Sequence, residues 1–439
     1  MNNSAAVLVA FNFPPLNVVA AQRAARMARE LLNRYDHVYV LRLSQEGLSP
    51  SFVDPDYCRD LLEHPNLHCI DVRPLLDRRG FSAQQLLTHR LAGSLLIRVL
   101  CSPGADWIPS LSRALAAVPE SLQVKVVIAT GPPFVSFITA LRWADGRSAP
   151  TILDYRDLWS RNPVAKYPKL ARVLINRWLE RPINRAATIM TTVSEGCRDV
   201  LLRDDPGVPI RLLMNVPDLA YCQYFESIAQ TCDPASAILD DSVLNITFTG
   251  QVYEHCTFAP LLRAIRQLPD AMRRRVMVHY YGVCSDMVVK EFIEYGLGDC
   301  LNDHGMVPKE AAIRALYGSH ILLSLVHASD TAMEPSITGL VTTKIFDYLL
   351  VNKPILNIGP PEAELNKFAC QIGCQMFHSF ISSDVESMAA FLQSALNGQM
   401  VDTPKSQNLQ IPDFASDFNR ILDEVEHMVD GRFQPVKTD

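Results

Sequence analysis

Short apolar segments alternate with segments of helical periodicity along most of this chain. The first apolar segment, residues 6–13, is followed by apolar side chains at helical spacing between Ala24 and Leu31 and then by a second apolar segment at 38–43. Consecutive parallel strands need a crossover connection, usually a helix, between them. The alternation therefore predicts an α/β fold with a parallel sheet and crossover helices.

The alternation is interrupted in the middle of the chain. It weakens near Pro217 and starts again with a strand-like segment at 244–249. The 439 residues exceed what one ordinary hydrophobic core supports, so two domains of roughly 200 residues each are expected. We predict doubly wound domains at 1–218 and 240–400, and a terminal helix at 411–430 whose apolar stripe packs back on the protein. Within the second domain the pattern predicts helices at 260–268 and 309–317 and strands at 276–281, 321–326 and 355–358.

The composition is that of a globular protein, with 48% hydrophobic and 20% charged residues. The formal net charge of −6 argues against a nucleic-acid partner, because nucleic acids are bound mainly by surplus positive charge. The eleven cysteines form no CxxC pair, so we expect no metal site. The N-terminus lacks the pattern of a signal peptide, and the apolar stretch at 126–141 is too short and interrupted to span a bilayer. A cytoplasmic protein is expected.

One segment, residues 339–356, combines groups that suit a nucleoside diphosphate. Thr342 or Thr343 can cap a helix whose unpaired N–H groups and positive dipole end favour a phosphate. Lys344 adds a full positive charge beside them, and Asp347, one turn further on, can accept hydrogen bonds from a ribose diol. The segment therefore predicts a site for the diphosphate and the ribose of a nucleotide.

An ordinary surface helix fits the same residues. In that interpretation Lys344 and Asp347 form an ion pair three positions apart, and the threonines only cap the helix. Asn352 is expected to end the helix in either case. Taken alone, this segment leaves both interpretations open.

Polar residues follow several strands of the N-terminal half. Ligands of open parallel sheets bind beyond the carboxyl ends of the strands, so these loops hold the candidates for acceptor binding. The candidates are Arg23, Thr130, Gly131, Asp154, Arg156, Asp157 and Ser194.

These candidates also have structural interpretations. Arg23 fits a solvated helix arginine, and Asp154 and Arg156 fit a structural ion-pair network. Ser194 fits a simple helix cap.

The second half offers further candidates. The backbone of Gly250 and Gln251, after the strand at 244–249, can donate hydrogen bonds to a diphosphate. Glu334, in the loop before the segment 339–356, can hold sugar hydroxyls or simply be solvated. No GxGxxG follows the first strand, and neither a Walker lysine motif nor a GxSxG motif occurs, which removes the main support for a dehydrogenase, a P-loop protein or a hydrolase.

Taken together, these segments resemble the glycosyltransferase family 4-like enzymes of the GT-B fold, over most of the chain. The residues that carry the resemblance are Phe13-Pro-Pro15 with Gln22-Arg23, Asp154-Tyr-Arg-Asp157-Leu-Trp159, Thr192-Val-Ser-Glu-Gly196, Phe248-Thr-Gly250, Lys344-Ile-Phe-Asp347-Tyr-Leu and Lys353-Pro-Ile-Leu356.

The resemblance implies two Rossmann-like domains that face each other across a cleft. It also implies sugar transfer from a nucleotide-diphosphate donor, with retention at the anomeric carbon and with neither a cofactor nor a required metal. The acceptor would be a glycan, a lipid-linked molecule or a small molecule in surface polysaccharide or glycoconjugate assembly. Peripheral contact with the inner face of a membrane is a further expectation from the family.

The resemblance also assigns roles to residues. Lys344 would stabilise the departing diphosphate, and Asp347 would hold the ribose. Asp157 would contact the acceptor or the donor sugar, and Glu334 would replace a glutamate that the family carries at the position of Gly339 here.

The chain also departs from the family pattern. Gly339 and Asp347 stand where the family often has two glutamates, and the arginine and lysine that usually come after the glycine at position 250 are absent, with Gln251 next to Gly250. Two alternatives stay open, and the missing cations favour the first of them. One is a catalytically silent GT-B protein that binds a glycan or a partner enzyme, and the other is a nucleotide-sugar epimerase of the same fold.

Overall fold

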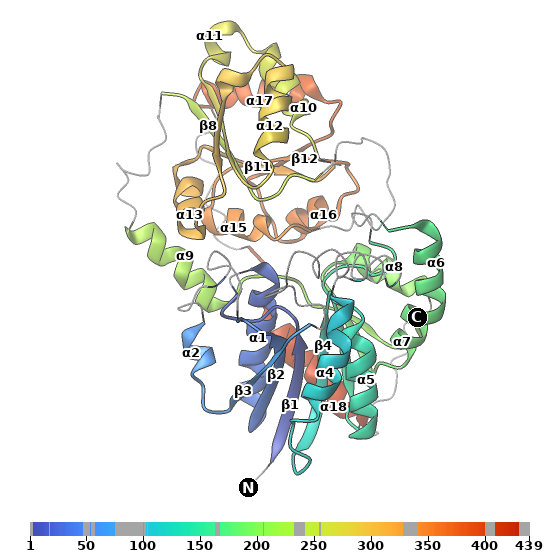
Figure 1. Cartoon of the computed structure of the whole chain (residues 1–439). Coiled ribbons are helices and arrows are strands. Elements are labelled where there is room, and N and C mark those ends of the chain that lie inside the picture. The colour runs from blue at the N-terminus through green and yellow to red at the C-terminus, as the bar shows by residue number, and fades with distance from the viewer. Residues whose placement is uncertain are drawn as a thin grey trace, which may run out of the picture. The chain divides into compact units, whose positions relative to one another are not determined.

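The chain folds into two compact units, each built on one parallel sheet (Figure 1). The structure, a computed structural model, describes residues 3–16, 18–46, 53, 58–74, 100, 102, 104–162, 167–204, 206–231, 242–253, 256–327, 341–399 and 409–429. The first unit comprises residues 1–215 together with 413–439, and the second comprises residues 216–412. Two doubly wound domains were predicted, and both sheets confirm this part of the fold.

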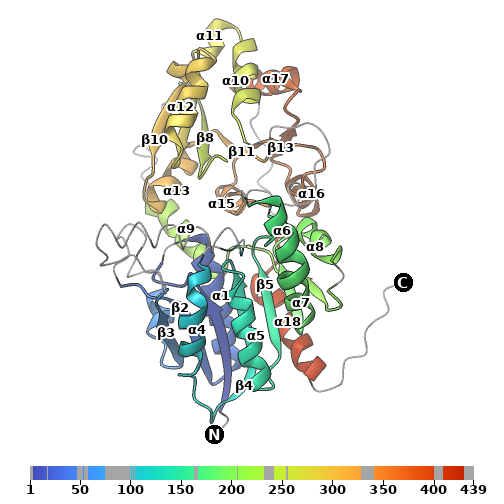
Figure 2. The same ribbon diagram turned by 45° about the vertical axis from the view of Figure 1, so that its right-hand side comes forward.

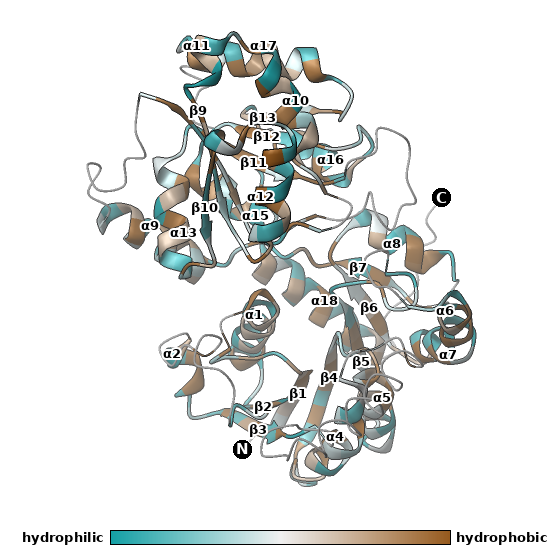
Figure 3. Ribbon diagram, turned by 45° about the horizontal axis from the view of Figure 1, so that its top comes forward, coloured by the Kyte–Doolittle hydropathy of each residue, from teal (hydrophilic) through white to brown (hydrophobic). Residues whose placement is uncertain are grey.

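The first unit contains a seven-stranded sheet in the order β3-β2-β1-β4-β5-β6-β7. Helices α1 and α18 cover one face of this sheet, and α4 and α5 cover the other (Figure 3). Because both faces are covered, strands such as β1 are almost entirely buried and apolar. The elements are β1 Ser4–Ala10, α1 Val19–Arg34, β2 His37–Leu43, α2 Arg59–Leu62, β3 Leu67–Val72, α4 Ile108–Leu115, β4 Gln123–Gly131, α5 Ser136–Gly146, β5 Thr151–Tyr155, α6 Lys169–Ile175, a π turn Asn176–Glu180, α7 Arg181–Arg185, β6 Ile189–Thr192, α8 Glu195–Leu202, β7 Ile210–Leu212 and α18 Phe414–Val429.

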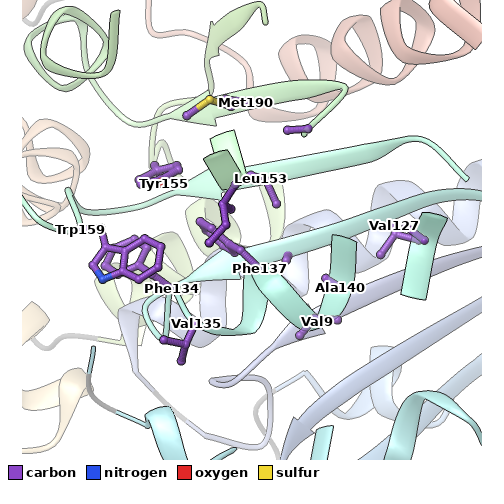
Figure 4. Close-up of a cluster of buried hydrophobic side chains, with 14 of the residues drawn as sticks. Val9, Val127, Phe134, Val135, Phe137, Ala140, Leu153, Tyr155, Trp159 and Met190 are labelled. Atoms are coloured by element: carbon purple, nitrogen blue, oxygen red, sulfur yellow. The ribbon is translucent and has the colours of Figure 1, made fainter. Parts of the chain in front are cut away.

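Aromatic side chains fill the core between this sheet and α5 (Figure 4). The Phe134 ring stacks on Trp159 and on Tyr155, with centroid distances of 5.6 and 5.4 Å. The buried polar atoms are also paired, since the Tyr155 hydroxyl donates to Asn184 Oδ1 at 2.7 Å. Two aromatic residues of the segment 154–159 are therefore core residues.

The second unit contains a six-stranded sheet in the order β10-β9-β8-β11-β12-β13. Helices α10, α12 and α17 share one hydrophobic core with its strands, and α13, α15 and α16 form the other layer (Figure 2). The elements are α9 Leu219–Thr231, β8 Leu244–Thr249, α10 Ala259–Gln267, α11 Asp270–Arg273, β9 Val276–Tyr281, α12 Ser285–Glu294, β10 Leu301–Gly305, α13 Lys309–Gly318, β11 Ile321–Leu325, α15 Lys344–Val351, β12 Ile355–Ile358, α16 Glu364–Gln371, β13 Phe377–Phe380 and α17 Val385–Leu396.

The C-terminal helix α18 packs back on the first unit, as predicted. Its apolar stripe is buried, with Phe418 and Leu422 fully enclosed. Ion pairs fasten its polar side, because Arg34 on α1 bonds to Asp423 and Glu426 at 2.6 Å each. None of the helices in the described ranges combines the length and the apolar character needed to cross a membrane.

Candidate functional site

The Lys344 side chain lies at the carboxyl end of β8 in the second unit. Its Nζ is 3.5 Å from the centroid of the buried Phe248 ring. Burial lowers the pKa of Lys344 to about 7, an effect that the nearby Cys256 thiol partly opposes. Within the described ranges, neither a carboxylate nor a hydrogen-bond acceptor is paired with this ammonium. The side chain is therefore placed to receive an anion.

Gly250 lies beside Lys344, and Gly282 lies against Gly250. Gly250 has a φ of 104°, a conformation that side chains disfavour, and a Cβ there would lie 3.7 Å from Lys344 Nζ. At Gly282 a Cβ would lie 2.2 Å from the Gly250 carbonyl oxygen, so only glycine fits. The next residue, Gln251, is exposed. The chain thus brings bare backbone and one cation together at this strand end.

Helix α15 begins at Lys344 with Thr343 at the N-cap position. Among the described contacts neither threonine makes the predicted side-chain cap, and the buried Thr342 hydroxyl has no hydrogen-bond partner there. The predicted C-terminus is confirmed, because Asn352 adopts the left-handed conformation with a φ of 58°. A buried hydroxyl and an ammonium two positions apart in the sequence, both without partners among the described residues, support a polar ligand at this helix start.

Asp347 pairs with a residue from another helix rather than with Lys344. Its Oδ2 lies 2.5 Å from Lys309 Nζ on α13, and its Oδ1 accepts a hydrogen bond of 2.8 Å from the Tyr221 hydroxyl on α9. The Lys309 ammonium also lies over the Tyr221 ring, 5.6 Å from its centroid. The surface-helix interpretation with a Lys344–Asp347 ion pair is therefore wrong.

In the first unit, Arg23 and Asp154 form a buried bidentate ion pair. The two Arg23–Asp154 hydrogen bonds measure 2.6 and 3.0 Å, and the hydroxyls of Thr130 and Thr191 each donate to the same carboxylate at 2.7 Å. Burial disfavours the charged carboxylate, but Arg23 and the two threonines outweigh it and lower the pKa of Asp154. Arg23 also donates to the Leu213 carbonyl at 2.8 Å. The network joins α1, β4, β5 and β6, so the solvated-arginine interpretation of Arg23 is wrong.

Arg156 and Gly131 are brought together beyond the ends of β4 and β5. The guanidinium of Arg156 donates to the carbonyl oxygens of Gly131 and Pro132 at 3.0 and 2.8 Å. A Cβ on Gly131 would lie 2.6 Å from the Phe134 ring, which explains the glycine. These contacts shape the loop that follows β4.

Asp157 and Ser194 follow the neighbouring strands β5 and β6. Asp157 is exposed, yet nearby protein atoms displace water from its carboxyl group. This loss of hydration raises the pKa of Asp157, and the positive charge of Arg156 partly opposes the rise. Ser194 caps α8, as predicted, by accepting a hydrogen bond of 3.2 Å from the Cys197 amide. Of the acceptor candidates, Asp157 is the charged side chain that solvent reaches most easily.

Four of the acceptor candidates are almost fully enclosed. Arg23, Thr130, Asp154 and Ser194 are between 0% and 2% exposed. A contact between these side chains and an acceptor would need their present hydrogen bonds to open. Their role in acceptor binding stays a prediction.

Some predicted positions lie outside the described residues. Glu334 and Gly339 belong to this group. In the described ranges, no three His, Cys, Asp or Glu side chains gather in a way that could hold a metal ion.

Sequence reasoning missed three residues of the second-unit site. Lys309 and Tyr221 hold Asp347, and Phe248 lies under Lys344. Phe248 is the last apolar residue of β8, one position before the strand ends at Thr249, and this position could have indicated it. Lys309 and Tyr221 carry no such signal.

Comparison with known proteins identifies the fold. No family model and no curated protein matches the sequence. Among solved structures, sucrose-phosphate synthase from Thermosynechococcus elongatus is similar with a TM-score of 0.59 and 11% identity, covering 98% of each chain. Anabaena HepE in complex with UDP-glucose has a TM-score of 0.55 and 11% identity, covering 97% of this chain and 98% of that chain. A UDP-N-acetylglucosamine 2-epimerase has a TM-score of 0.54 and 13% identity, covering 100% of both chains.

These likenesses extend over whole chains that contain two Rossmann-like domains. Together with the two parallel sheets, they confirm the predicted GT-B fold. At such low identity they establish the fold alone.

Proposed function

We propose that this protein is a retaining glycosyltransferase that moves a sugar from a nucleoside-diphosphate donor to a glycan, lipid-linked or small-molecule acceptor. The observation that carries the proposal is the half-buried Lys344 ammonium beside Gly250 at a strand end, which has no charged or hydrogen-bonding partner among the described residues. The solved structure of HepE, a protein of the same fold, contains UDP-glucose, which supports a nucleotide-sugar donor here. We place the reaction in the cytoplasm, in surface polysaccharide or glycoconjugate assembly.

The proposed chemistry uses Lys344 at the leaving group. When the bond between the sugar and the diphosphate breaks, negative charge grows on the diphosphate oxygens. An ammonium already fixed beside them stabilises that charge without reorganisation. The N-terminus of α15 and the Thr342 hydroxyl would add hydrogen-bond donors at the start of the same helix.

Other predicted residues have roles in the same proposal. Asp347 would accept hydrogen bonds from the ribose with the carboxylate lone pairs that Lys309 and Tyr221 leave available. Asp157 and Glu334 would contact the reacting sugars. Asp157 is exposed in the structure, and Glu334 lies outside the described residues.

Thermal stabilisation by a panel of nucleoside diphosphates and their sugars tests the donor site. We expect at least one of them to raise the unfolding temperature of the wild type and to lose this effect in Lys344→Ala. The matched control is Lys290→Ala, because Lys290 is a 77%-exposed surface lysine of the same unit. The donor site is refuted if no nucleotide stabilises the protein, and the role of Lys344 is refuted if Lys344→Ala responds like wild type.

Product analysis then separates enzyme from binding protein. A transferase consumes the nucleotide sugar only with an acceptor, and NMR of the product gives the anomeric configuration. The second candidate function, a nucleotide-sugar epimerase, is favoured by the likeness to the UDP-N-acetylglucosamine 2-epimerase. An epimerase would convert the nucleotide sugar without any acceptor, and a catalytically silent protein would bind it without turnover.

A further inference from the structure

The hydroxyl of Tyr348, on helix α15, joins two strands at the centre of the second sheet. It accepts a hydrogen bond of 3.2 Å from the Thr249 amide at the end of β8 and donates one of 3.0 Å to the Leu323 carbonyl oxygen of β11. Burial raises the pKa of Tyr348 to about 12, an effect that its hydrogen bonds to Thr249 partly oppose, so the hydroxyl keeps the proton that it donates. The side chain is fully enclosed. It is therefore placed to hold the site together rather than to contact a ligand.

The strands β8 and β11 lie on either side of the point where the strand order of this sheet reverses. From β8 the chain moves outwards to β9 and β10, and it then returns to β11 on the other side of β8. Ligands of such sheets bind beyond the carboxyl ends of the strands at this point. Within the described residues the pairing of β8 with β11 covers Ile246 and Thr247, so Thr249 lies past its end. The Tyr348 hydroxyl thus gives the Thr249 amide the acceptor that a neighbouring strand would otherwise supply.

One side of α15 contacts three consecutive residues of this strand end. Lys344 and Tyr348 are four positions apart, which places them on the same side of the helix. The Lys344 ammonium lies over the Phe248 ring and beside Gly250. Between these two contacts, Tyr348 holds the Thr249 amide. The separation between the Lys344 ammonium and the Gly250 backbone therefore depends on how firmly Tyr348 ties the helix to the strand.

We propose that Tyr348 is a positioning residue of the donor site, which holds the Gly250 backbone and the Lys344 ammonium at the separation that one diphosphate needs. This inference rests on the proposed function, because it takes the ligand at Lys344 to be a nucleoside diphosphate. A diphosphate can bind the backbone and the ammonium together without first ordering them only if their separation is fixed in the ligand-free protein. The ring of Tyr348 fills the space between helix and strand, and its hydroxyl supplies the two hydrogen bonds.

Tyr348→Phe tests this role, because it removes the hydroxyl and keeps the ring. Titration calorimetry uses the nucleoside diphosphate that stabilises the wild type most strongly. We expect the dissociation constant to rise by about tenfold to hundredfold in Tyr348→Phe, since small displacements of binding groups have effects of this size. The matched control is Tyr155→Phe, which also deletes a fully buried tyrosine hydroxyl, one that donates to Asn184 at 2.7 Å in the core of the first unit. This control should bind like wild type, and chemical denaturation checks that both variants lose comparable stability.

The pH dependence of binding gives a readout that a loss of stability alone does not change. Burial lowers the pKa of Lys344 to about 7, so the wild-type affinity should begin to fall near this pH. A looser strand end lets water reach the ammonium, which raises this pKa towards 10.5. In Tyr348→Phe the fall should therefore begin at a higher pH, while Tyr155→Phe should keep the wild-type profile. The Cys256 thiol, a titratable neighbour of the ammonium, is the same in all three proteins.

Hydrogen–deuterium exchange examines the contact without any ligand. The Thr249 amide donates to the Tyr348 hydroxyl, so its exchange should be faster in Tyr348→Phe than in the wild type. Tyr155→Phe should leave this exchange unchanged, because its hydroxyl lies in the other unit. In the wild type, the bound nucleoside diphosphate should slow the exchange of the same amide further.

The combined results separate this inference from the proposed function. Faster exchange in Tyr348→Phe, together with wild-type affinity and an unchanged pH profile, would make the hydrogen bonds structural only and overturn the positioning role. Unchanged exchange would overturn it as well, because the strand end would then be held without the hydroxyl. If the wild type binds no nucleoside diphosphate, the proposed function itself fails, whatever the exchange of Thr249 shows, and the positioning role fails with it.

Discussion

The ammonium of Lys344 lies 3.5 Å from the centroid of the Phe248 ring, at the carboxyl end of β8. The electron-rich face of the ring attracts the cation, but a neutral ring does not compensate its charge as a carboxylate would. Burial therefore lowers the pKa of Lys344 to about 7. A bound anion would raise this pKa again. The charge of Lys344 therefore lowers the stability of the ligand-free protein and raises its affinity for a diphosphate.

We predict that Lys344→Met raises the thermal midpoint of the ligand-free protein at acidic pH. Below a pH of about 7 the lysine is charged in both the folded and the unfolded state, so burial imposes its full penalty on the folded state. A gain of about 1 kcal/mol corresponds to about 2–4 °C in a domain of this size. The gain should shrink as pH rises from about 7 towards 10.5, the usual value for lysine. Calorimetry across this range measures the effect, with Lys290→Met as the control, and a lower midpoint would contradict the assignment.

We also predict that nucleoside-diphosphate affinity falls as pH rises above about 7. Binding needs the charged Lys344, so above its pKa each binding event must take up a proton. The dissociation constant should rise by about tenfold per pH unit until the pKa of the bound state is reached. Isothermal titration calorimetry in buffers of different ionisation enthalpy measures both the affinity and the proton uptake.

Lys344→Arg is the control for this pH dependence, because arginine stays charged over the whole range. If the arginine variant binds at all, its affinity should not show the decrease above a pH of about 7 that deprotonation of Lys344 causes. Parallel pH profiles for the two proteins would show that another group causes the dependence.

Local features of the fold could be read from the sequence. The strands predicted at 244–249, 276–281 and 355–358 match β8, β9 and β12. Each is a short apolar run bounded by turn residues, and such runs form buried parallel strands. Asn352 and Ser194 end and begin helices as predicted, because each acts on backbone within a few positions of itself.

The partners of charged side chains could not be read in the same way. Lys344 and Asp347 are three positions apart, yet Asp347 pairs with Lys309 from another helix. Arg23 and Asp154 are separated by 131 positions. Lys309, although distant in the sequence, pairs with Asp347 because the packing of the two helices brings their side chains together. Sequence spacing carries no information about that packing. The sequence therefore predicts at which strand ends the candidate site lies, but it does not predict which side chains form hydrogen bonds there.

We predict measurable coupling between Lys309 and Asp347. The pair is partly buried, with side chains 35% and 12% exposed, so we expect a coupling energy of about 1–2 kcal/mol, between exposed and buried pairs. A double-mutant cycle with Lys309→Met and Asp347→Asn, followed by chemical denaturation, gives this value. Glu310→Gln is the control on the same helix, because it removes a more exposed pair with Arg314. Coupling near zero would mean that the contact contributes nothing to stability.

We predict that Arg23→Leu destabilises the first unit severely. Among the described side chains it leaves the hydroxyls of Thr130 and Thr191 as the donors to the fully buried Asp154 carboxylate, and removing one partner of a buried pair costs about 3–5 kcal/mol. Thr191→Val, which deletes one neutral donor, should cost only about 1–3 kcal/mol.

The contribution of Asp154 to stability depends on pH. Because its folded-state pKa is lowered, this contribution is present above the usual pKa of 3.8 and is lost as pH falls through the folded-state value. Acid unfolding of Arg23→Leu should therefore lack this step and begin from a lower stability. If Arg23→Leu instead keeps wild-type stability and raises only the KM for the acceptor, then Arg23 binds the acceptor and the ion pair is not what holds α1 against the sheet.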